Sequence, residues 1–350
     1  MKISFCVITY NRISDLKKAI YSILSLNGLD SIEYELLVSD DSKDNITKDF
    51  VHSLSINNKN IKYLRNKTHG QFNNLNNVTN HAKYDWIVFL HDDDILGKDY
   101  LGKILEVREK VEKEDIDILW GARNLIDKED LKFNTLLGSK SSLGDFVEVN
   151  SKEFLYQMLG EHDYTYRGKV IFPMVTGIMV RAELAKRVMF DTSFEVNADG
   201  LFLWKIFFHS NKSLFINAPI VNYRWVDNSE RAKPSEQGIV YREMKGILLA
   251  MIAYMESELG KKNMQSAKKQ FMNSFYFNAA NIDSPITWVS LRYKGGYIKR
   301  VRIVLHIIFD IIKNYPKVLI KPSLYLCTVV CFLPQSVLKF FYRYYIKRII

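Results

Sequence analysis

The stretch VFLHDDDIL, residues 88–96, places three consecutive carboxylates, Asp92, Asp93 and Asp94, at the end of an apolar run. Neighbouring carboxylates repel one another, and each loses hydration when its surroundings close around it. One explanation is that a cation compensates them. The other is an acidic turn between a strand and a helix, in which one aspartate caps the helix. The residues around this stretch have to distinguish the two.

The composition is that of a folded, non-secreted protein. Of the 350 residues, 47% are hydrophobic and 13% aromatic, which is enough for a substantial core. The 3 cysteines are too few for a disulfide framework, and no C-x-x-C pair suggests zinc, so we expect a reducing environment. The N-terminal MKISFCVITYNR shows no secretory signal peptide. These features predict a cytoplasmic location.

The positive charge is concentrated at the C-terminus. Residues 290–350 contain 12 Lys or Arg residues and one acidic residue, whereas the other 289 residues contain 37 basic and 38 acidic ones. A nearly neutral body argues against nucleic-acid binding. Segments 297–313 and 337–350 mix apolar, aromatic and basic residues, as do helices that lie on anionic membranes. The alternative is a helical subdomain with a solvated basic face; we predict peripheral attachment to the inner face of the cell membrane.

An alternation of strands and helices runs along the first part of the chain. Apolar runs predict strands at 3–9, 34–39, 62–64, 86–90 and 116–120, with helices at 14–26, 73–81 and 98–111. This order predicts an α/β fold with a mostly parallel sheet. Farther along we expect strands at 175–180, 213–217 and 219–225, helices at 152–159, 182–188 and 197–210, and helical sequence from about residue 235.

Polar clusters follow three of the predicted strands, namely TYNR (9–12), SDDSKD (39–44) and HDDD (91–94). Ligands of such sheets bind at the carboxyl ends of the strands, where these clusters lie. The sequence has neither a G-x-G-x-x-G fingerprint after the first strand nor a Walker A loop. A bound diphosphate would therefore need another source of positive charge, and a divalent Mg²⁺ or Mn²⁺ ion held by carboxylates supplies it.

Taken together and in this order, TYNR, SDDSKD and FLHDDDIL resemble the family 2 glycosyltransferases, over about residues 1–225. The resemblance implies a GT-A catalytic domain at 1–230, with a nucleotide-sugar half at about 1–120 and an acceptor half at about 121–230. A helical, basic, membrane-associating region would follow at 231–350. The implied activity is inverting, metal-dependent transfer of a sugar from a nucleotide diphosphate, usually UDP, to a lipid-linked glycan acceptor of bacterial surface-polysaccharide synthesis.

The resemblance also assigns roles to residues of the first half. Asp93 aligns with the metal ligand and Asp92 lies near the ribose, while His91 stands where the family usually has its first aspartate. His91 would bond the ribose or a phosphate, or cap the strand, and Asp94 would cap the following helix. The other donor contacts implied are Thr9, Tyr10 and Arg12 at the base and ribose, Asp41 at the base, and Asn76 before the metal strand.

In the second half, NADGLFLW resembles the segment that carries the family's general base. This assigns to Asp199 the removal of the acceptor proton, although a helix cap would also suit the residue. Arg224 could hold the diphosphate or be an ordinary strand-end arginine, and His69 could approach the phosphates. Trp204 and Phe207 are predicted to face the core. In the segment 160–169, His162 and Asp163 suit acceptor contact or an exposed loop.

Two other classes of protein remain open on the sequence. One is a metal-dependent nucleotidyltransferase, although TYNR lacks the basic, glycine-containing signature usual for that class. The other is a non-catalytic nucleotide-sugar-binding relative, which would explain why Ala198 and His91 replace acidic residues of the family pattern. Metal-dependent turnover of a nucleotide sugar distinguishes both from a glycosyltransferase.

Overall fold

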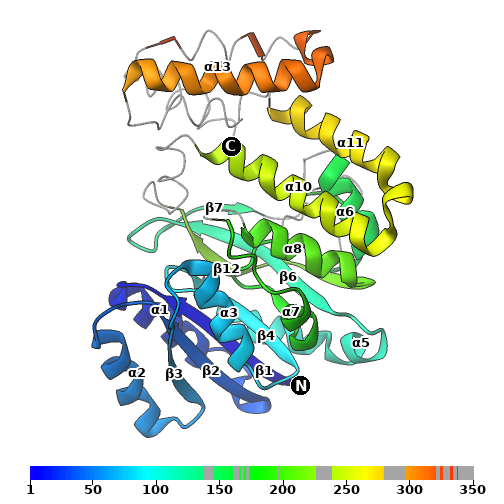
Figure 1. Cartoon of the computed structure of the whole chain (residues 1–350). Coiled ribbons are helices and arrows are strands. Elements are labelled where there is room, and N and C mark those ends of the chain that lie inside the picture. Colours follow the sequence, from blue (N-terminus) through cyan, green and yellow to red (C-terminus); the bar gives the residue numbers. More distant parts are fainter. Residues whose placement is uncertain are drawn as a thin grey trace. The chain divides into compact units, whose positions relative to one another are not determined.

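The structure is a computed structural model, and it contains two compact units (Figure 1). The first comprises Met1–Met158, Asp163–Ser193 and Ala198–Val226, and the second Leu159–His162, Phe194–Asn197 and Asp227–Ile350. The predicted domain boundary at residue 230 stays a prediction. The residues described are 1–136, 145–160, 165–166, 169–170, 173–194, 198–225, 239–279, 296–320, 324–325, 332–333 and 337.

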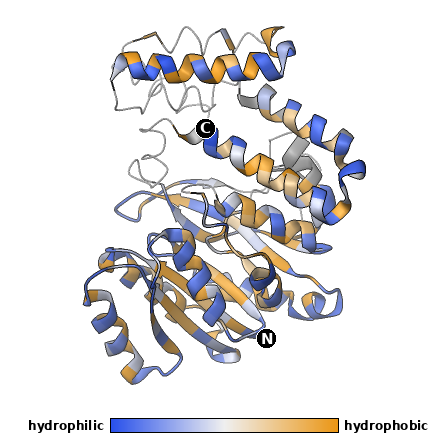
Figure 2. Cartoon of the chain, viewed as in Figure 1, coloured by the Kyte–Doolittle hydropathy of each residue, from blue (hydrophilic) through white to orange (hydrophobic). Residues whose placement is uncertain are grey.

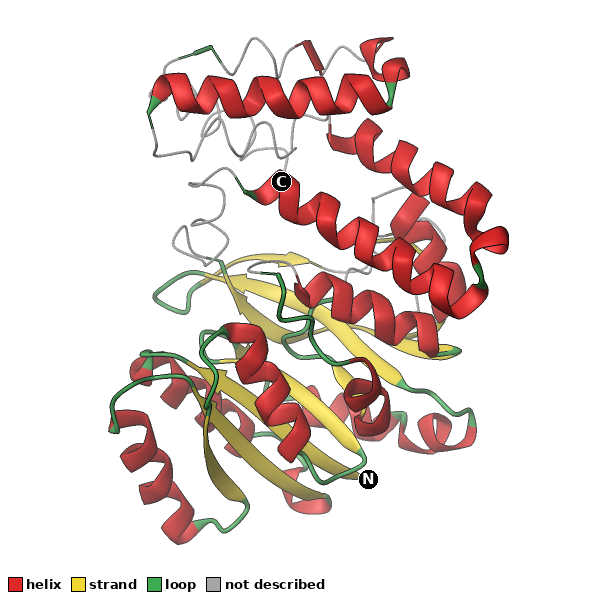
Figure 3. Cartoon of the chain, in the orientation of Figure 1, coloured by secondary structure: helices red, strands yellow, loops and turns green. Residues whose placement is uncertain are grey.

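Strands and helices alternate from Lys2 to His91, as the sequence predicts for the first part of the chain, and several strands farther along follow one another directly (Figure 3). Its strands are β1 (Lys2–Thr9), β2 (Glu33–Asp40), β3 (Ile61–Arg65), β4 (Trp86–His91), β5 (Ile95–Leu96), β6 (Ile118–Ile126), β7 (Lys132–Leu136), β8 (Phe146–Asn150), β9 (Thr165–Tyr166), β10 (Lys169–Val170), β11 (Met179–Arg181) and β12 (Lys212–Arg224). Its helices are α1 (Ile13–Leu24), η1 (Leu29–Ser31), α2 (Ile46–Asn57), α3 (Gln71–His81), α4 (Tyr100–Glu106), α5 (Arg108–Lys113), α7 (Ala182–Val188) and α8 (Ala198–His209), and α6 (Ser151–Gly160) extends to the unit boundary.

One large mixed sheet organises this unit, with the order β3-β2-β1-β4-β11-β6-β12-β5. The pairs β2–β3, β1–β2 and β1–β4 are parallel, which confirms the predicted parallel arrangement for the N-terminal half. Beyond β4 most pairings are antiparallel, with β11 between β4 and β6. Strands β7 and β8 pair with β6 and β12. The parallel half thus brings the ends of β1, β2 and β4 to one edge.

Both faces of the sheet are covered by apolar side chains. On one face, Phe5 and Val7 of β1 belong to the same cluster as Leu16 and Ile20 of α1. On the other face the rings of Phe89, Phe190 and Phe202 pack together, with the centroids of Phe190 and Phe202 3.9 Å apart. The predicted core positions are confirmed, since Trp204 and Phe207 in α8 are 1% and 0% exposed.

Four predicted elements differ from the structure. The expected helix at 98–111 is two helices, α4 and α5, separated at Val107. The expected strands 213–217 and 219–225 are one strand, β12, whose pairing with β6 shifts register around Pro219. Proline lacks the backbone N–H that a regular strand pairing needs, which explains why the register between β12 and β6 shifts at Pro219. The expected strand at 175–180 begins only at Met179, after a turn in which Gly177 has φ +77°.

The described part of the second unit is helical, with α10 (Val240–Leu259), α11 (Lys261–Ala279), α13 (Tyr297–Asn314) and η2 (Pro316–Ile320). Helix α13 buries Val304, Ile307 and Ile311 along one side, while Ile298 and Phe309 are 79% and 66% exposed. Figure 2 shows hydrophilic and hydrophobic residues interleaved along this helix.

In the part of the chain that the structure describes, no helix is both long and apolar enough to cross a bilayer. Nearly all of the predicted interfacial segment 337–350, together with His162 and Asp163, lies outside the described residues.

Candidate functional site

The carboxyl ends of β1, β2 and β4 meet at one edge of the sheet, as their registers require. Thr9 is paired with Asp40 of β2, and Ile8 is paired with His91 of β4. The three polar clusters singled out in the sequence therefore become neighbours in space. This edge is the candidate functional site.

Asp92 lies at the centre of this edge and is almost fully buried. The Thr9 hydroxyl donates to its Oδ2 at 2.7 Å, and the Tyr10 backbone N–H donates to the same oxygen at 3.4 Å. Burial and the neighbouring charge of Asp93 raise the pKa of Asp92 to about 7, although the Arg12 guanidinium and the Thr9 hydroxyl oppose the rise. Asp92 is therefore held by the end of β1, beside the predicted nucleotide residues.

The guanidinium of Arg12 contacts two of the three neighbouring carboxylates. Its Nη1 lies 2.6 Å from Oδ2 of Asp93 and 3.4 Å from Oδ1 of Asp92. The sequence predicted that Arg12 lines the base and ribose pocket and that the compensating cation is a metal. In the structure, Arg12 itself supplies positive charge to two of the three carboxylates.

Asp94 points away from Arg12, into the protein. Its Oδ1 accepts the backbone N–H of Arg224 at 2.8 Å, and its Oδ2 meets no hydrogen-bond partner among the residues described. Burial and the charge of Asp93 raise the pKa of Asp94 well above its ordinary value. The prediction that Asp94 caps a helix is wrong, because the short strand β5 follows it and α4 begins only at Tyr100.

The side chain of Arg224 is committed to neighbouring protein groups. Its Nε donates to the backbone oxygen of Asp93 at 2.8 Å, and its two Nη atoms bond the backbone oxygen of Asp127 and the carboxylate of Asp130. Only 5% of this side chain is exposed. Arg224 therefore fixes the backbone beneath Asp93 and Asp94, while its suggested contact with a diphosphate stays a prediction.

The same cluster contains a group suited to a divalent ion. His91, Asp93 and Asp94 each offer one ligand atom, and these atoms lie within 4.8 Å of one another. The buried Oδ2 of Asp94 is an acceptor that a cation would satisfy, and the carboxylates of Asp93 and Asp94 are the ligand type that suits Mn²⁺ and Mg²⁺. The sequence assigned the metal to Asp93 alone, and it interpreted Asp94 as a helix cap rather than as a candidate ligand.

Asp41 forms the second part of the edge, at the end of β2. Its Oδ1 accepts the Asn66 amide at 2.9 Å and its Oδ2 accepts the Gly70 N–H at 3.0 Å. Nδ1 of His69 lies 2.7 Å from the same Oδ2, and its ring meets Tyr10 edge-on with the centroids 5.3 Å apart. His69 thus lies beside the predicted base-binding residues, whereas the sequence placed it near the phosphates.

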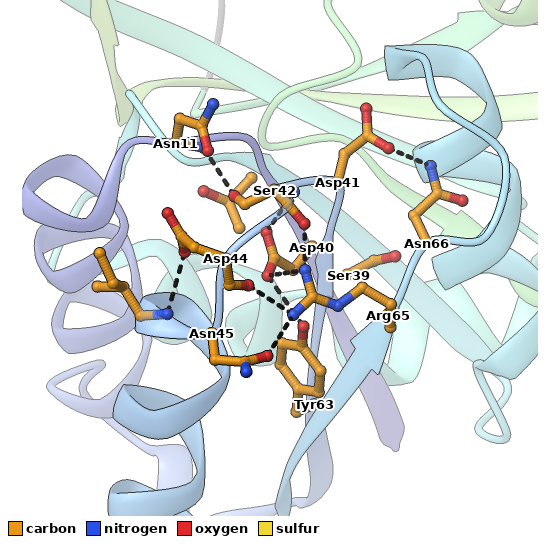
Figure 4. Close-up of polar contacts among 12 residues, drawn as sticks. Asn11, Ser39, Asp40, Asp41, Ser42, Asp44, Asn45, Tyr63, Arg65 and Asn66 are labelled. Atoms are coloured by element: carbon orange, nitrogen blue, oxygen red, sulfur yellow. Dashed lines mark hydrogen bonds and ion pairs between the residues drawn. The ribbon is translucent and has the colours of Figure 1, made fainter.

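A network that the sequence did not reveal supports this position (Figure 4). The fully buried Asp40 accepts the Ser42 N–H at 2.8 Å and the Tyr63 hydroxyl at 2.9 Å, and it pairs with Arg65 at 3.3 Å. The Ser42 hydroxyl in turn accepts the backbone N–H of Asn11 at 2.8 Å. The network joins the loop after β2 to the TYNR loop after β1. In Figure 4 Asp41 points away from it, toward Asn66.

Two asparagines of α3 have different surroundings. Asn76 was predicted to contact the nucleotide-sugar donor. Its amide donates to the backbone oxygen of Phe190 at 2.9 Å and accepts the backbone N–H of the same residue at 2.8 Å. The buried Asn74 instead donates to the backbone oxygens of Thr9 and Ser39, at 3.2 and 3.1 Å. Asn74 is therefore the residue that ties the ends of β1 and β2 together, and the amide of Asn76 is occupied elsewhere.

Asp199 lies in the first turn of α8, one residue after the helix begins. It is partly exposed, and its Oδ1 accepts the backbone N–H of Gly200 at 2.9 Å. The assignment of Asp199 as the general base stays a prediction.

Comparisons with known proteins place these features in context. The GalNAc(5)-diNAcBac-PP-undecaprenol beta-1,3-glucosyltransferase of Campylobacter jejuni is 30% identical over 167 residues, which are 44% of this chain and 53% of that protein. An uncharacterised glycosyltransferase of Mycoplasma genitalium is 35% identical over 103 residues, which are 28% of this chain and 34% of that protein. The aligned region thus spans about half, or less, of each relative.

Solved structures of S. aureus TarS share the fold. The structure of its residues 1–349 in complex with UDP-GlcNAc matches with a TM-score of 0.61 and 18% identity, over 98% of this chain and 92% of that one. This likeness confirms the predicted α/β fold of the GT-A type. The model of the family described as "Glycosyl transferase family 2" matches residues 4–187, more than half of the sequence. The chain therefore belongs to glycosyl transferase family 2.

Proposed function

We propose that this protein transfers a sugar from a UDP-sugar to a lipid-linked glycan, with inversion and with the help of a divalent metal. The observation that carries the proposal is the meeting of Thr9, Asp41 and the Asp92–Asp94 cluster at one sheet edge of a family 2 fold. Support for the donor comes from TarS, which was solved with UDP-GlcNAc and with UDP. Support for the acceptor comes from the Campylobacter relative, whose name describes an undecaprenol-linked oligosaccharide.

The donor nucleotide is proposed to lie along the ends of β1 and β2. Tyr10 is 42% exposed and offers an aromatic face, while the Asp41 carboxylate, fixed by Asn66 and Gly70, offers an acceptor for the N–H of a base. Asp92 is assigned to the ribose. This places the diphosphate toward Asp93, where the predicted metal ligands gather.

In the chemical step, an acceptor hydroxyl oxygen bonds to the anomeric carbon as the bond from that carbon to the diphosphate oxygen breaks. Asp199 is assigned to take the hydroxyl proton, and the nucleoside diphosphate leaves on the opposite face, which inverts the anomeric centre. His91, Asp93 and Asp94 would hold the metal, which when bound stabilises the charge on the leaving diphosphate. Arg224 keeps the backbone of Asp93 in place.

The test is to incubate the purified protein with a panel of nucleotide sugars and a lipid-linked acceptor, with Mn²⁺ or with EDTA, and to measure nucleoside diphosphate release. Release that requires Mn²⁺ and falls at least about a hundredfold in Asp93→Asn and Asp199→Asn supports the proposal. Asp49→Asn, an exposed carboxylate in α2, is the matched control and should keep full activity.

The same assay separates the alternatives. A nucleotidyltransferase would release pyrophosphate from a nucleoside triphosphate and a sugar phosphate. A non-catalytic relative would bind UDP and raise the melting temperature without releasing nucleotide. If UDP, GDP and dTDP all fail to raise the melting temperature in the presence of Mn²⁺, the assigned donor site is wrong.

The lipid-linked acceptor implies work at a membrane surface, and we assign that contact to the second unit, at the inner face of the cell membrane. Its helix α13 combines the exposed apolar residues Ile298 and Phe309 with the exposed cations Lys299, Arg302 and Lys313. An amphipathic basic helix of this kind binds anionic lipid headgroups while its apolar side chains reach the acyl boundary.

A further inference from the structure

Two arginines reach the carboxylate cluster, and they differ in their exposure to solvent. Arg224 is 5% exposed, and its guanidinium bonds Asp93, Asp127 and Asp130. Moving it would leave a buried charge without compensation, which is strongly unfavourable. Arg12 is 37% exposed, and its Nη1 bonds the carboxylates of Asp93 and Asp92. A guanidinium that leaves the carboxylates at this exposure remains hydrated, so exchange costs Arg12 less than it would cost Arg224.

The position of Arg12 conflicts with a metal at the same carboxylates. Its Nη1 lies 2.6 Å from Oδ2 of Asp93, and Asp93 shares the group of closely spaced ligand atoms with His91 and Asp94. A divalent ion bound there would stand a few ångströms from the guanidinium, with strong repulsion between like charges. Withdrawal of Arg12 from Asp93 would therefore favour binding of the metal.

A bound diphosphate would offer the Arg12 guanidinium new hydrogen-bond acceptors in place of Asp93. Arg12 follows the end of β1, and the diphosphate of the proposed donor would lie beside Asp93. Guanidinium groups bind phosphate oxygens through paired N–H donors, so the exchange replaces one charge-assisted contact by another. We propose that Arg12 is an exchangeable counter-ion, which bonds Asp93 before the metal binds and bonds the donor diphosphate afterwards. This inference rests on the proposed function, and it makes the binding of metal and of nucleotide mutually favourable.

The first experiment measures the affinity for Mn²⁺ alone by calorimetry, in the wild type, Arg12→Gln and Lys18→Gln. Arg12→Gln should bind Mn²⁺ about tenfold more tightly, because the competing cation is gone. Lys18 is the matched control, since it also lies in the region of α1 but pairs with Asp130, at 2.5 Å. Its removal should change the Mn²⁺ affinity by less than about twofold. Arg12→Lys keeps the charge and should stay close to the wild type.

The second experiment measures the affinities for uridine, UMP and UDP at saturating Mn²⁺. If Arg12 moves to the diphosphate, Arg12→Gln should weaken UDP about tenfold, UMP less, and uridine not at all. Equal melting temperatures of the variants, without ligands, would show that the fold is unchanged.

Several outcomes would overturn the inference. Unchanged or weaker Mn²⁺ binding by Arg12→Gln would show that Arg12 does not compete with the metal. An equal loss for uridine, UMP and UDP would place Arg12 at the base and ribose, as the resemblance implied. These results would leave the proposed function intact. If the wild type bound no Mn²⁺ even with UDP, both the metal dependence in the proposed function and the role of Arg12 would fall.

Discussion

At the scale of the residue, the three neighbouring carboxylates are tolerated because each has a different surrounding. Asp92 is held by Thr9, Asp93 pairs with Arg12, and Asp94 accepts the backbone N–H of Arg224. Burial still makes ionisation of Asp92 unfavourable, with a pKa of about 7. The sequence correctly predicted a need for positive charge near these carboxylates. It could not show that Arg12, 80 residues from Asp92 in the chain, would contact them.

Asp130 allows a test of how burial controls the strength of an ion pair, because it binds both Arg224 and Lys18. The Arg224 side chain is 5% exposed and also bonds backbone oxygens, so Arg224→Met should lower the free energy of unfolding by about 3 kcal/mol. The Lys18 side chain is 39% exposed, so Lys18→Met should cost about 0.5 kcal/mol or less. Urea denaturation followed by tryptophan fluorescence measures both. Equal losses in the two variants would contradict the buried, supporting role of Arg224.

At the scale of the element, the local sequence pattern predicted the positions of helices and strands better than it predicted which strands pair in the sheet. The helix at 182–188 is found with the same bounds, because its apolar positions recur at the helical period. The pairing of β11 between β4 and β6 depends on contacts between distant segments, and no local signal revealed it. The sequence likewise did not single out Asn74, because the spacing within a motif does not tell which face of a helix meets the strand ends. The donor role of Asn76 stays a prediction.

The contact between α10 and α13 gives a prediction about pH. Asp310 accepts hydrogen bonds from Tyr241 and Lys245, both at 2.7 Å. Burial acts to raise the pKa of Asp310, but these partners outweigh it and hold the pKa below the ordinary 3.8. A carboxyl group whose pKa is lower in the folded state stabilises the fold above its unfolded pKa, and this contribution is lost as the pH falls through the folded value.

Asp310→Asn should therefore destabilise the helical unit by about 1–2 kcal/mol at neutral pH, and the difference from the wild type should shrink at about pH 3. Hydrogen exchange of α13 peptides measures the local effect. Because His306 also acts on Asp310 electrostatically, the variant is compared with the wild type separately at each pH. A difference that persists undiminished in acid would show that the ionised carboxylate is not what stabilises the contact.

At the scale of the whole molecule, the positive charge is concentrated in the C-terminal segment and the rest of the chain is nearly neutral. Residues 290–350 carry 12 basic residues and one acidic residue, and that one, Asp310, is used internally to bind Lys245. The basic residues of this segment therefore far outnumber its acidic residues. A protein with a nearly neutral catalytic unit and a strongly basic helical unit is expected to approach an anionic surface with the basic unit first.

Vesicle binding tests this expectation on the full chain. The wild type should bind vesicles that contain anionic phosphatidylglycerol and should be released by salt, and it should bind neutral phosphatidylcholine vesicles much more weakly. Phe309→Asp on α13 should weaken the binding about tenfold, because it removes a 66%-exposed apolar side chain and adds a negative charge. Ile56→Asp is the matched control, since Ile56 is 70% exposed but belongs to α2 of the catalytic unit. If both variants bind as the wild type does, the exposed face of α13 does not contact the membrane.

If both variants bind the vesicles equally weakly, the effect is one of net charge and does not depend on this helix. Loss confined to Phe309→Asp, with nucleotide release from the donor in the presence of a water-soluble acceptor unchanged, would show that α13 brings the enzyme to the surface that carries the proposed lipid-linked acceptor.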